Sequence, residues 1–403
     1  MPPKYQKLDQ ISHIHQRPDT YVGATKPLKE DNVWMMESQE EHIKIIKKDG
    51  ILLSQGLMRI FIEAISNAID NVWRSKEAGI PCTKIKVNID KETGLTSVWN
   101  DGLGIPVEIN EETGLYNPEL IFGHLLTSSN YDDTEERMTS GRNGLGIKLT
   151  NVFSVWFKVD LCDTTTHKNY SKEWKCNMRE SSKEKMKKST SKKNYTEISW
   201  IPDFSKFKMK GYDDNTISVY SKIVYDMAMI TGVNVSLNDV KVPIKNLADY
   251  AKFYMDCGNK EVLNLKSDNC QVVVMPNTSG DFEFVAFANG VENKEGGVHV
   301  DAWVEDIFRP LVSKFNKTGK PSITIKDVKR FFRIFVNATV ANPEFNNQSK
   351  TRLTHPQIKT KVENKHITAI SKWSVCDNIK DIIKGKEMLT LKKTERKTKA
   401  FKK

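Results

Sequence analysis

The stretch Glu63-Ala64-Ile65-Ser66-Asn67-Ala68-Ile69-Asp70-Asn71 lies in a segment whose apolar residues recur at helical spacing. We therefore expect a helix with one face toward the core. Glu63, Asn67, Asp70 and Asn71 stand at positions i, i+4, i+7 and i+8, so they line one stripe beside the apolar face. Polar groups at such a boundary need partners, because burying them unpaired costs free energy. Taken alone, the stripe fits a solvated helix face better than a binding site.

Two members of the stripe have chemistry suited to a phosphate–metal site. The amide oxygen of Asn67 is a hard ligand, which suits Mg²⁺ because this ion prefers oxygen and retains several waters. Glu63, one helical turn earlier, can act as a general base on a water molecule, which typically contributes about 10²–10⁴-fold in rate. The functional interpretation of the helix therefore depends on whether phosphate-binding segments follow it.

Two segments containing glycines do follow. Asn100-Asp101-Gly102-Leu103-Gly104-Ile105-Pro106 leaves the end of an expected strand, where glycines allow a tight turn close to a ligand, although an ordinary loop turn is the alternative. The loop 141–146 precedes an expected helix, whose first N–H groups can cradle a phosphate, and Lys148 adds a positive charge. It is neither a Walker A loop nor a Rossmann loop. The polar stretch Thr127–Ser140 before it is expected to form a flexible lid.

Length and composition favour a two-domain intracellular protein. The chain has 403 residues, and we place the boundary between residues 245 and 246. It has no apolar run of about 18 residues and no secretory signal, so no membrane span is expected. Its six cysteines lack CxxC spacing, which argues against a zinc site or a disulfide framework and fits a reducing compartment.

The charge suggests a polyanionic partner. The net charge is +11 and the isoelectric point is about 9.1, which fits either a nucleic-acid partner or a lysine-rich soluble surface. Basic residues concentrate in Lys183–Lys193 and Lys392–Lys403. Both segments lack apolar periodicity, so we expect a loop and a tail. They could serve as nuclear signals, as DNA contacts or as neither.

Periodicity predicts the remaining elements, with no internal repeat. The expected helices are 57–72, 147–153, 217–230, 300–315 and 326–331. The expected strands are 84–90, 96–99, a hairpin at 233–244, 271–275, 282–288 and 332–339.

Together these segments resemble the ATPase region of type IIA DNA topoisomerases, in the eukaryotic or large-virus branch. That family belongs to the superfamily of gyrase, heat-shock chaperone, histidine-kinase and mismatch-repair ATPases. The resemblance covers nearly the whole chain. Its anchors are 17–23, 63–71, 99–107, 120–123, 125–133, 141–154, 204–209, 296–301 and Gln348-Ser349-Lys350.

The resemblance implies an α/β (α+β) fold with two domains. Residues 1–245 would form an N-terminal strap and a Bergerat-type ATP-binding α/β sandwich, and residues 246–403 a ribosomal-protein-like α/β transducer with a basic C-terminal tail. The chain lacks the family's acidic Glu-Gly-Asp-Ser and Asp-x-Asp segments and an identifiable DNA-cleaving tyrosine module. We therefore expect an N-terminal fragment or a separate ATPase subunit that does not cut DNA itself, and the abrupt basic end favours the fragment.

The resemblance also assigns roles to residues. Glu63 would be the general base, Asn67 would hold Mg²⁺, and Lys350 would reach the γ-phosphate from the second domain together with Gln348. Asn100 would replace the superfamily's adenine-reading aspartate. The other residues implied at the nucleotide are Asp70 and Asn71 on the helix; Ser128, Ser129 and Asn130 at ribose and α-phosphate; Arg142, Asn143, Gly144, Leu145 and Gly146 around the triphosphate; Lys148 nearby; and Tyr5, which would cross to the partner subunit's nucleotide.

Two positions depart from the family's usual pattern. Ser349 stands where threonine is usual, and it keeps the hydroxyl. Leu145 stands where the eukaryotic branch usually has tyrosine, so an aromatic contact to the nucleotide is lost.

The implied mechanism is an ATP-operated gate. ATP and Mg²⁺ would bind each protomer, a homodimer would close around double-stranded DNA, and hydrolysis would reopen it; the cleavage domains would lie in cis or on a separate subunit. Two alternatives remain: a chaperone-like or mismatch-repair-like ATP clamp, and a nucleic-acid-binding module whose ATP site has decayed. An intracellular location is expected, in the nucleus, a host cell or a virion.

Overall fold

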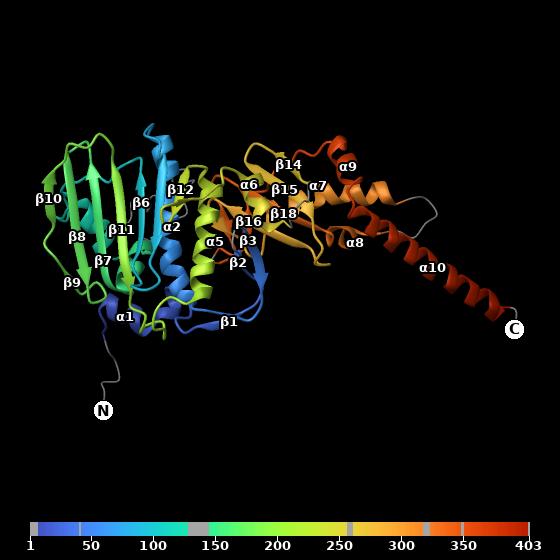
Figure 1. The fold of residues 1–403 in the computed structure, drawn as a ribbon, viewed down its shortest axis with the longest axis horizontal. Helices are drawn as coiled ribbons and strands as arrows, with labels where there is room; N and C mark the ends of the chain where they lie inside the picture. Colours follow the sequence, from blue (N-terminus) through green and yellow to red (C-terminus); the bar gives the residue numbers. More distant parts are fainter. Residues whose placement is uncertain are drawn as a thin grey trace, which may run out of the picture. The chain divides into compact units, whose positions relative to one another are not determined.

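The chain divides into two compact units, Met1–Tyr254 and Met255–Lys403 (Figure 1). This computed structural model describes residues 7–39, 42–127, 145–255, 261–316, 323–347 and 350–401.

The first unit extends past residue 245, where the sequence analysis places the boundary. The additional segment contains helix α6 (Leu247–Ala251) and the 3₁₀ turn η2 (Lys252–Tyr254). The buried Tyr250 hydroxyl donates to Asp226 Oδ1 over 2.6 Å, and the Tyr254 ring meets Trp34 edge-on at 5.0 Å between centroids. These contacts attach the segment to the first unit.

A twisted, mostly antiparallel sheet forms the centre of the first unit. Among the described residues it has nine strands in the order β10-β8-β7-β11-β6-β5-β12-β13, with β9 paired to β8. Only the β12–β5 pair is parallel. The strands are β5 (Lys84–Ile89), β6 (Thr96–Asp101), β7 (Ser154–Asp163), β8 (Lys168–Lys175), β9 (Glu180–Ser181), β10 (Lys185–Lys188), β11 (Tyr195–Pro202), β12 (Asn234–Leu237) and β13 (Val240–Lys241).

Helices cover one face of this sheet. They are α2 (Gln55–Glu77), α3 (Asn117–Gly123), α4 (Gly146–Val152) and α5 (Asp214–Thr231). Helix α2 begins after Ser54, whose Oγ accepts a hydrogen bond from the Leu57 N–H at 3.2 Å. Its apolar face is fully buried, and Phe61 stacks on Tyr220 of α5 at 3.8 Å between centroids. The predicted helix is confirmed and is longer than residues 57–72.

The N-terminal part of the first unit adds small elements around this core. They are α1 (Gln10–Gln16), η1 (Pro18–Thr20), the paired strands β1 (Leu28–Glu30) and β4 (Ile51–Leu53), and the ribbon β2 (Val33–Gln39) with β3 (His42–Lys48). Helix α1 packs on the body through His15, whose ring meets Phe153 edge-on at 5.2 Å.

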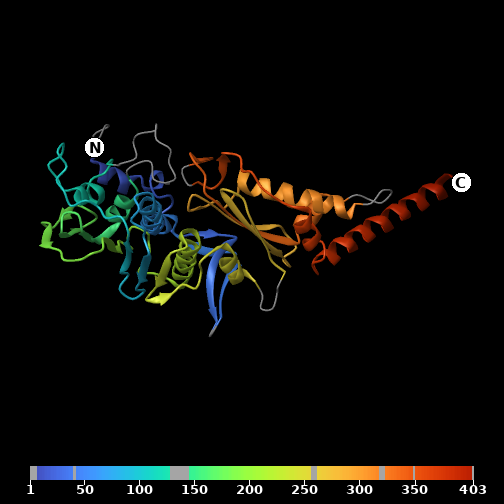
Figure 2. The ribbon, with the colours of Figure 1, turned by 90° about the horizontal axis from the view of Figure 1, so that it is seen from above.

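The second unit is a five-stranded sheet packed against helices, with strand order β14-β15-β18-β16-β17 in the described residues. Helix α7 lies along the sheet (Figure 2), and its fully buried Trp303, Ile307 and Phe308 belong to the core of this unit. The strands are β14 (Leu263–Lys266), β15 (Cys270–Pro276), β16 (Glu283–Ala288), β17 (Val291–Glu292), β18 (Phe332–Ala338), and the separate pair β19 (Glu344–Phe345) and β20 (Leu353–His355). The helices are α7 (Val298–Phe315), α8 (Ile325–Lys329), α9 (Asn364–Ile370) and α10 (Cys376–Phe401).

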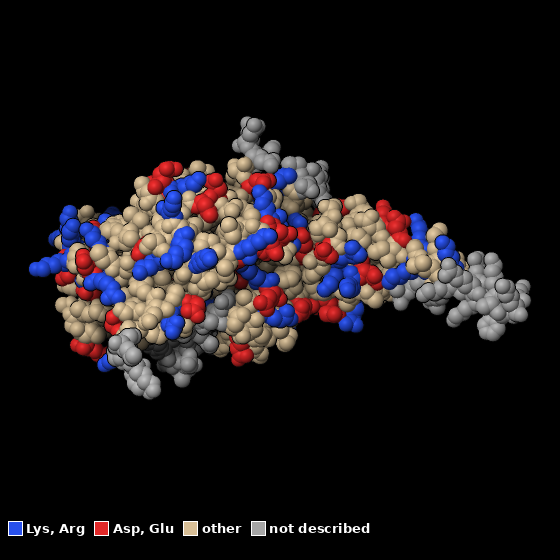
Figure 3. Space-filling view, turned by 90° about the horizontal axis from the view of Figure 1, so that it is seen from below, with Lys and Arg blue, Asp and Glu red and all other residues tan. Residues whose placement is uncertain are grey.

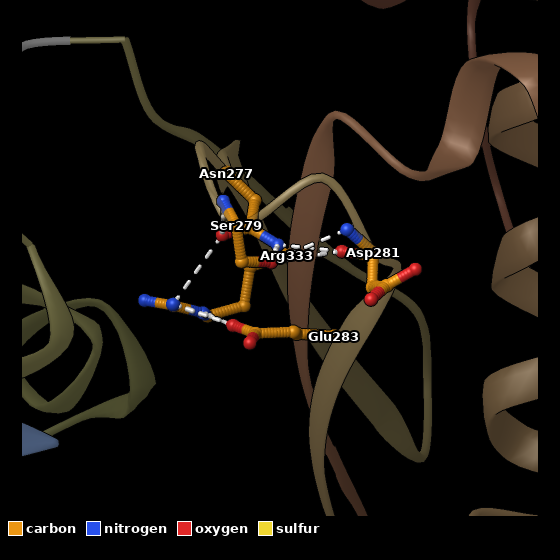
Figure 4. A network of polar contacts seen from close by, with 5 residues as sticks. All are labelled: Asn277, Ser279, Asp281, Glu283 and Arg333. Carbon is orange, nitrogen blue, oxygen red and sulfur yellow. Dashed lines mark hydrogen bonds and ion pairs between the residues drawn. The ribbon is translucent and has the colours of Figure 1, made fainter. Parts of the chain in front are cut away.

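A buried ion pair joins the two central parallel strands of this sheet (Figure 4). Arg333 of β18 donates through Nε to Glu283 Oε2 of β16 over 2.7 Å, and both side chains are mostly buried. The Asn277 amide donates to Ser279 Oγ and to the Asp281 carbonyl, each over 2.7 Å. Arg333 Nη2 also donates to Asn277 Oδ1 over 3.5 Å, so the pair and the turn between β15 and β16 form one polar network.

The expectation of loop and tail for the two basic segments is wrong in part, since residues 183–184 and 189–193 do lie outside helices and strands. Lys185–Lys188 form the edge strand β10, because backbone pairing with β8 compensates for the missing apolar pattern, and lysine is common on edge strands. Helix α10 runs to Phe401, through most of Lys392–Lys403. Its first turns pack Cys376 and Ile379 into the core, and adding residues to an existing helix is easier than starting one.

The surface carries charges of both signs. On the face in Figure 3, lysine and arginine side chains are interspersed with aspartate and glutamate. Within the described ranges, no helix combines the length and apolar character needed to cross a bilayer.

We predict that Arg333→Leu lowers the free energy of unfolding of the second unit by about 3–5 kcal/mol, because the buried Glu283 carboxylate loses its partner. Urea unfolding followed by fluorescence measures this change. The matched control is Arg309→Leu, which breaks an exposed pair with Glu305 and should cost under about 1 kcal/mol. Equal costs for the two variants would contradict the prediction.

Candidate functional site

Helix α2 places the four predicted polar residues along one stripe, as expected. Asp70 and Asn71 are buried, whereas Glu63 and Asn67 are half-buried. The apolar side of the same helix is packed against α4 and α5. The polar stripe therefore lies at the edge of the core and is fixed by the packing behind it.

The Glu63 carboxylate is held from two sides. Its Oε1 lies 2.5 Å from Arg59 Nη2, one helical turn earlier. Its Oε2 faces the backbone of Gly146, where an added Cβ would overlap that oxygen. Gly146 thus leaves room for the carboxylate beside the start of α4, and an added Cβ would displace it. Arg59 was not predicted as a site residue, although its i,i+4 spacing to Glu63 is a usable signal.

Helix α4 is fixed to its surroundings by side-chain hydrogen bonds to backbone. Thr150 Oγ1 donates to the Ile60 carbonyl of α2 over 2.8 Å, and Asn151 Nδ2 donates to the Phe122 carbonyl over 3.0 Å. Lys148 is 3% exposed, and its Nζ donates to the Thr127 carbonyl over 2.5 Å. Burial lowers the pKa of Lys148 to about 8, because the charged ammonium loses solvation.

Asn71 and Asn100 converge on one carbonyl at the end of β6. Asn71 Nδ2 donates to the Asp101 carbonyl over 3.2 Å, and Asn100 Nδ2 donates to it over 3.1 Å. Asn100 is paired across the sheet with Ile85 and Thr196, which are buried on the face that the helices cover. The register therefore turns Asn100 toward α2.

Asp101 has a structural role in this arrangement. Its Oδ1 accepts the N–H groups of Thr83 and Lys84 at 2.7 and 2.8 Å, and its Oδ2 accepts the Thr83 hydroxyl. Burial alone would raise the pKa of Asp101, but these hydrogen bonds outweigh it and lower the pKa. The carboxylate thus anchors the strand end that carries Asn100.

The glycine after Asp101 allows close packing within the protein. Gly102 has φ +103°, and an added Cβ would overlap Ser75 Oγ and Cys82. Ser75 Oγ also accepts the Leu103 N–H at 2.7 Å. Here the glycine brings the loop against α2 and Cys82, whereas the sequence analysis expects it to bring the backbone close to a ligand.

The structure brings part of the predicted site together. Leu145 is the N-cap residue of α4, directly before Gly146, and both are half-buried. Lys350 lies in the second unit, with Nζ over the Phe345 ring at 5.8 Å from the centroid. The following predicted residues lie outside the described residues: Tyr5, Ser128, Ser129, Asn130, Arg142, Asn143, Gly144 and Gln348.

Models of two protein families match parts of the chain. Residues 53–174 match the family described as "Histidine kinase-, DNA gyrase B-, and HSP90-like ATPase". Residues 240–400 match the family described as "DNA gyrase B".

Curated relatives match nearly the whole chain over part of their own length. DNA topoisomerase 2 of Invertebrate iridescent virus 6 is 36% identical over 408 residues, which cover 95% of this chain and 35% of that protein. DNA topoisomerase 2 of Penicillium chrysogenum is 37% identical over 409 residues, with coverages of 97% and 25%. The chain thus spans about a third or less of the length of these relatives.

Solved structures match the fold. The ATPase region of Saccharomyces cerevisiae topoisomerase II has a TM-score of 0.84 and 31% identity, covering 94% of this chain and 98% of that one. The ATPase and transducer domains of DNA topoisomerase II from Balamuthia mandrillaris have a TM-score of 0.82 and 31% identity, with coverages of 92% and 95%. The 43K ATPase domain of Thermus thermophilus gyrase B shares the fold at 17% identity, with a TM-score of 0.60.

These matches confirm the predicted fold, an α/β ATPase domain followed by an α/β transducer. At 31% identity over 98% of the yeast ATPase region, the similarity amounts to family membership: this chain belongs to the type II DNA topoisomerases and corresponds to their ATPase region.

Proposed function

We propose that this chain binds Mg-ATP, hydrolyses it and thereby opens and closes the N-terminal gate of a type II DNA topoisomerase. The observation that carries the proposal is the Glu63 carboxylate, held between Arg59 and the first residue of α4. A general base must be fixed within hydrogen-bond reach of the proton that it removes. Arg59 and Gly146 limit the rotamers of Glu63, and they belong to the packed helices α2 and α4.

In this mechanism Glu63 accepts a proton from the attacking water. Arg59 contacts Oε1 of Glu63. The proton of the water would therefore be accepted by Oε2, which faces Gly146. The start of α4 has backbone N–H groups that suit phosphate oxygens. A phosphate placed there would lie on the same side as Glu63 Oε2, which would accept the proton of the attacking water.

The residues present fit a magnesium ion. Asn67 lies one turn after Glu63 on the same stripe, and its half-buried amide supplies the oxygen that Mg²⁺ prefers. In such sites the ion takes its remaining ligands from phosphates and water and neutralises charge on the phosphates. Asn67 would hold the ion beside the base.

Asn71 and Asn100 fit the nucleoside part of ATP. Each amide directs its NH₂ group to the Asp101 carbonyl, which leaves the amide oxygen as an acceptor. Adenine presents a 6-amino donor, so an acceptor at Asn100 can recognise it in place of a carboxylate. The neighbouring Asp70 and Asn71 would complete this side of the pocket.

The gate would consist of two protomers, each with ATP bound. We propose that Mg-ATP favours a closed homodimer that captures double-stranded DNA, with Tyr5 contacting the partner's nucleotide and Lys350 contacting the γ-phosphate. A ligand can drive closure only if it binds the closed state better than the open state. Contact of Lys350 with the triphosphate alone would supply that difference. The cleavage domains would act in cis or on a separate subunit.

We predict that Glu63→Gln keeps ATP binding and lowers the rate of hydrolysis about 10²–10⁴-fold, because the amide cannot accept the proton. Phosphate release and nucleotide titration measure the two properties. Glu77→Gln, at the exposed end of the same helix, is the matched control and should retain full turnover. Turnover within about twofold of wild type in Glu63→Gln would refute the assignment of the base.

We predict that a non-hydrolysable ATP analogue with Mg²⁺ converts the chain from monomer to dimer, because nucleotide completes a surface that the partner contacts. Solution mass with and without the analogue measures this change. A mass that stays monomeric while a titration shows bound analogue would contradict nucleotide-driven closure by this chain.

We predict that affinity for ATP falls as pH rises from 7 to 9. With a pKa of about 8, Lys148 is mainly charged below pH 8 and mainly neutral above it, so its attraction to phosphate is lost as pH rises. Titration with the ATP analogue at several pH values measures the effect. Lys148→Arg should remove this pH dependence, since arginine stays charged. The same decline with pH in that variant would assign the effect to another group.

A further inference from the structure

We propose that Asn293 and Arg352 are positioning residues for Lys350, which they tie to the N-terminal end of α7. This inference rests on the proposed contact of Lys350 with the γ-phosphate. It adds that the position of Lys350 follows α7, and with it the core of the second unit.

The segment carrying Lys350 is joined by its backbone to the segment before α7. The Glu295 N–H donates to the Thr351 carbonyl over 2.9 Å, and the Leu353 N–H donates to the Gly296 carbonyl over 3.1 Å. Gly297 has φ +137°, and an added Cβ would overlap the Leu353 backbone. Only glycine permits this approach, so Gly297 allows the two backbone segments to lie in direct contact.

Asn293 holds the Lys350 residue directly. Its side chain is fully buried, and Nδ2 donates to the Lys350 carbonyl over 2.8 Å. Lys350 has φ +56°, a left-handed conformation that is uncommon for residues other than glycine and needs support. Its own N–H donates to the Asn347 carbonyl over 3.0 Å. Hydrogen bonds to both its N–H and its carbonyl thus hold the backbone of Lys350 itself.

Arg352 joins the same loop to the first turn of α7. Its Nη2 contacts Asp301 Oδ2 at 2.7 Å, and its Nη1 donates to the Glu295 carbonyl over 3.0 Å. The planar fork of arginine suits two such contacts at once, which a lysine cannot reproduce. The adjacent His299 is buried, and burial together with Arg352 lowers its pKa to about 3, so it stays neutral. Asp301 is therefore the charged partner of Arg352 on α7.

The exposure of the Arg352–Asp301 pair favours a role in positioning Lys350 over a role in folding stability. The side chains of Arg352 and Asp301 are 42% and 61% exposed, and pairs so exposed contribute little to folding stability. Beyond them, α7 buries Trp303, Ile307 and Phe308 completely. Arg352 thus links the half-buried residues 350–352 to a helix that is packed in the core, which suits the placement of a group that acts on a phosphate.

The test is a double-mutant cycle on ATP turnover. Arg352→Met is made in the wild type and in Lys350→Ala, and kcat and KM are measured for each. We expect Arg352→Met to lower kcat/KM about tenfold, because a misplaced Lys350 loses part of its contact with the γ-phosphate. In Lys350→Ala it should have no further effect, because both changes remove one interaction. Arg352→Lys should recover part of the loss.

Controls separate positioning from folding. Arg309→Met breaks a similarly exposed pair on α7 and should leave kcat unchanged. Asn293→Ala, which removes the buried donor to Lys350, should also be non-additive with Lys350→Ala. Effects that multiply in the double variants would overturn the inference while leaving the proposed role of Lys350 intact. Full turnover in Lys350→Ala itself would overturn both.

Discussion

The site depends on one helix that is constrained on two sides. The apolar face of α2 is buried against α4 and α5, and this packing fixes the rotation of the helix about its axis. Rotation decides where Glu63, Asn67 and Asn71 point. Since protein interiors are close-packed, a small rotation would disturb many contacts at once. The core thus determines the direction of the polar stripe.

Close approach of a glycine to another segment of the chain is a second recurring feature. Gly146 admits the Glu63 carboxylate, Gly102 admits Ser75 and Cys82, and Gly297 admits the Leu353 backbone. In each case a Cβ would overlap a neighbouring atom. Glycine therefore brings together segments that are distant in the chain, and each of these contacts borders a residue with a proposed role.

Polar groups of the first unit divide into those that hold the fold and those that remain available for a ligand. Asp101 uses both carboxylate oxygens on Thr83 and Lys84, so it supports the strand end. Asn71 and Asn100 use only their NH₂ groups on the Asp101 carbonyl. Their amide oxygens are therefore oriented by the fold while still able to accept a hydrogen bond from a ligand.

The sequence by itself determined the main helices, the strands that flank them, the polar stripe of α2 and the family, because periodicity and ordered motifs are local properties of the chain. Strands β7, β8, β10 and β11 were not predicted, since their stability comes from pairing with distant strands. Helix α10 was not predicted at all, because its anchor is a core contact at Ile379. Only the tertiary structure placed Gly146 against Glu63, turned Asn100 toward α2 and tied Lys350 to α7. Those placements depend on packing and hydrogen bonds between residues far apart in sequence, which no local pattern records.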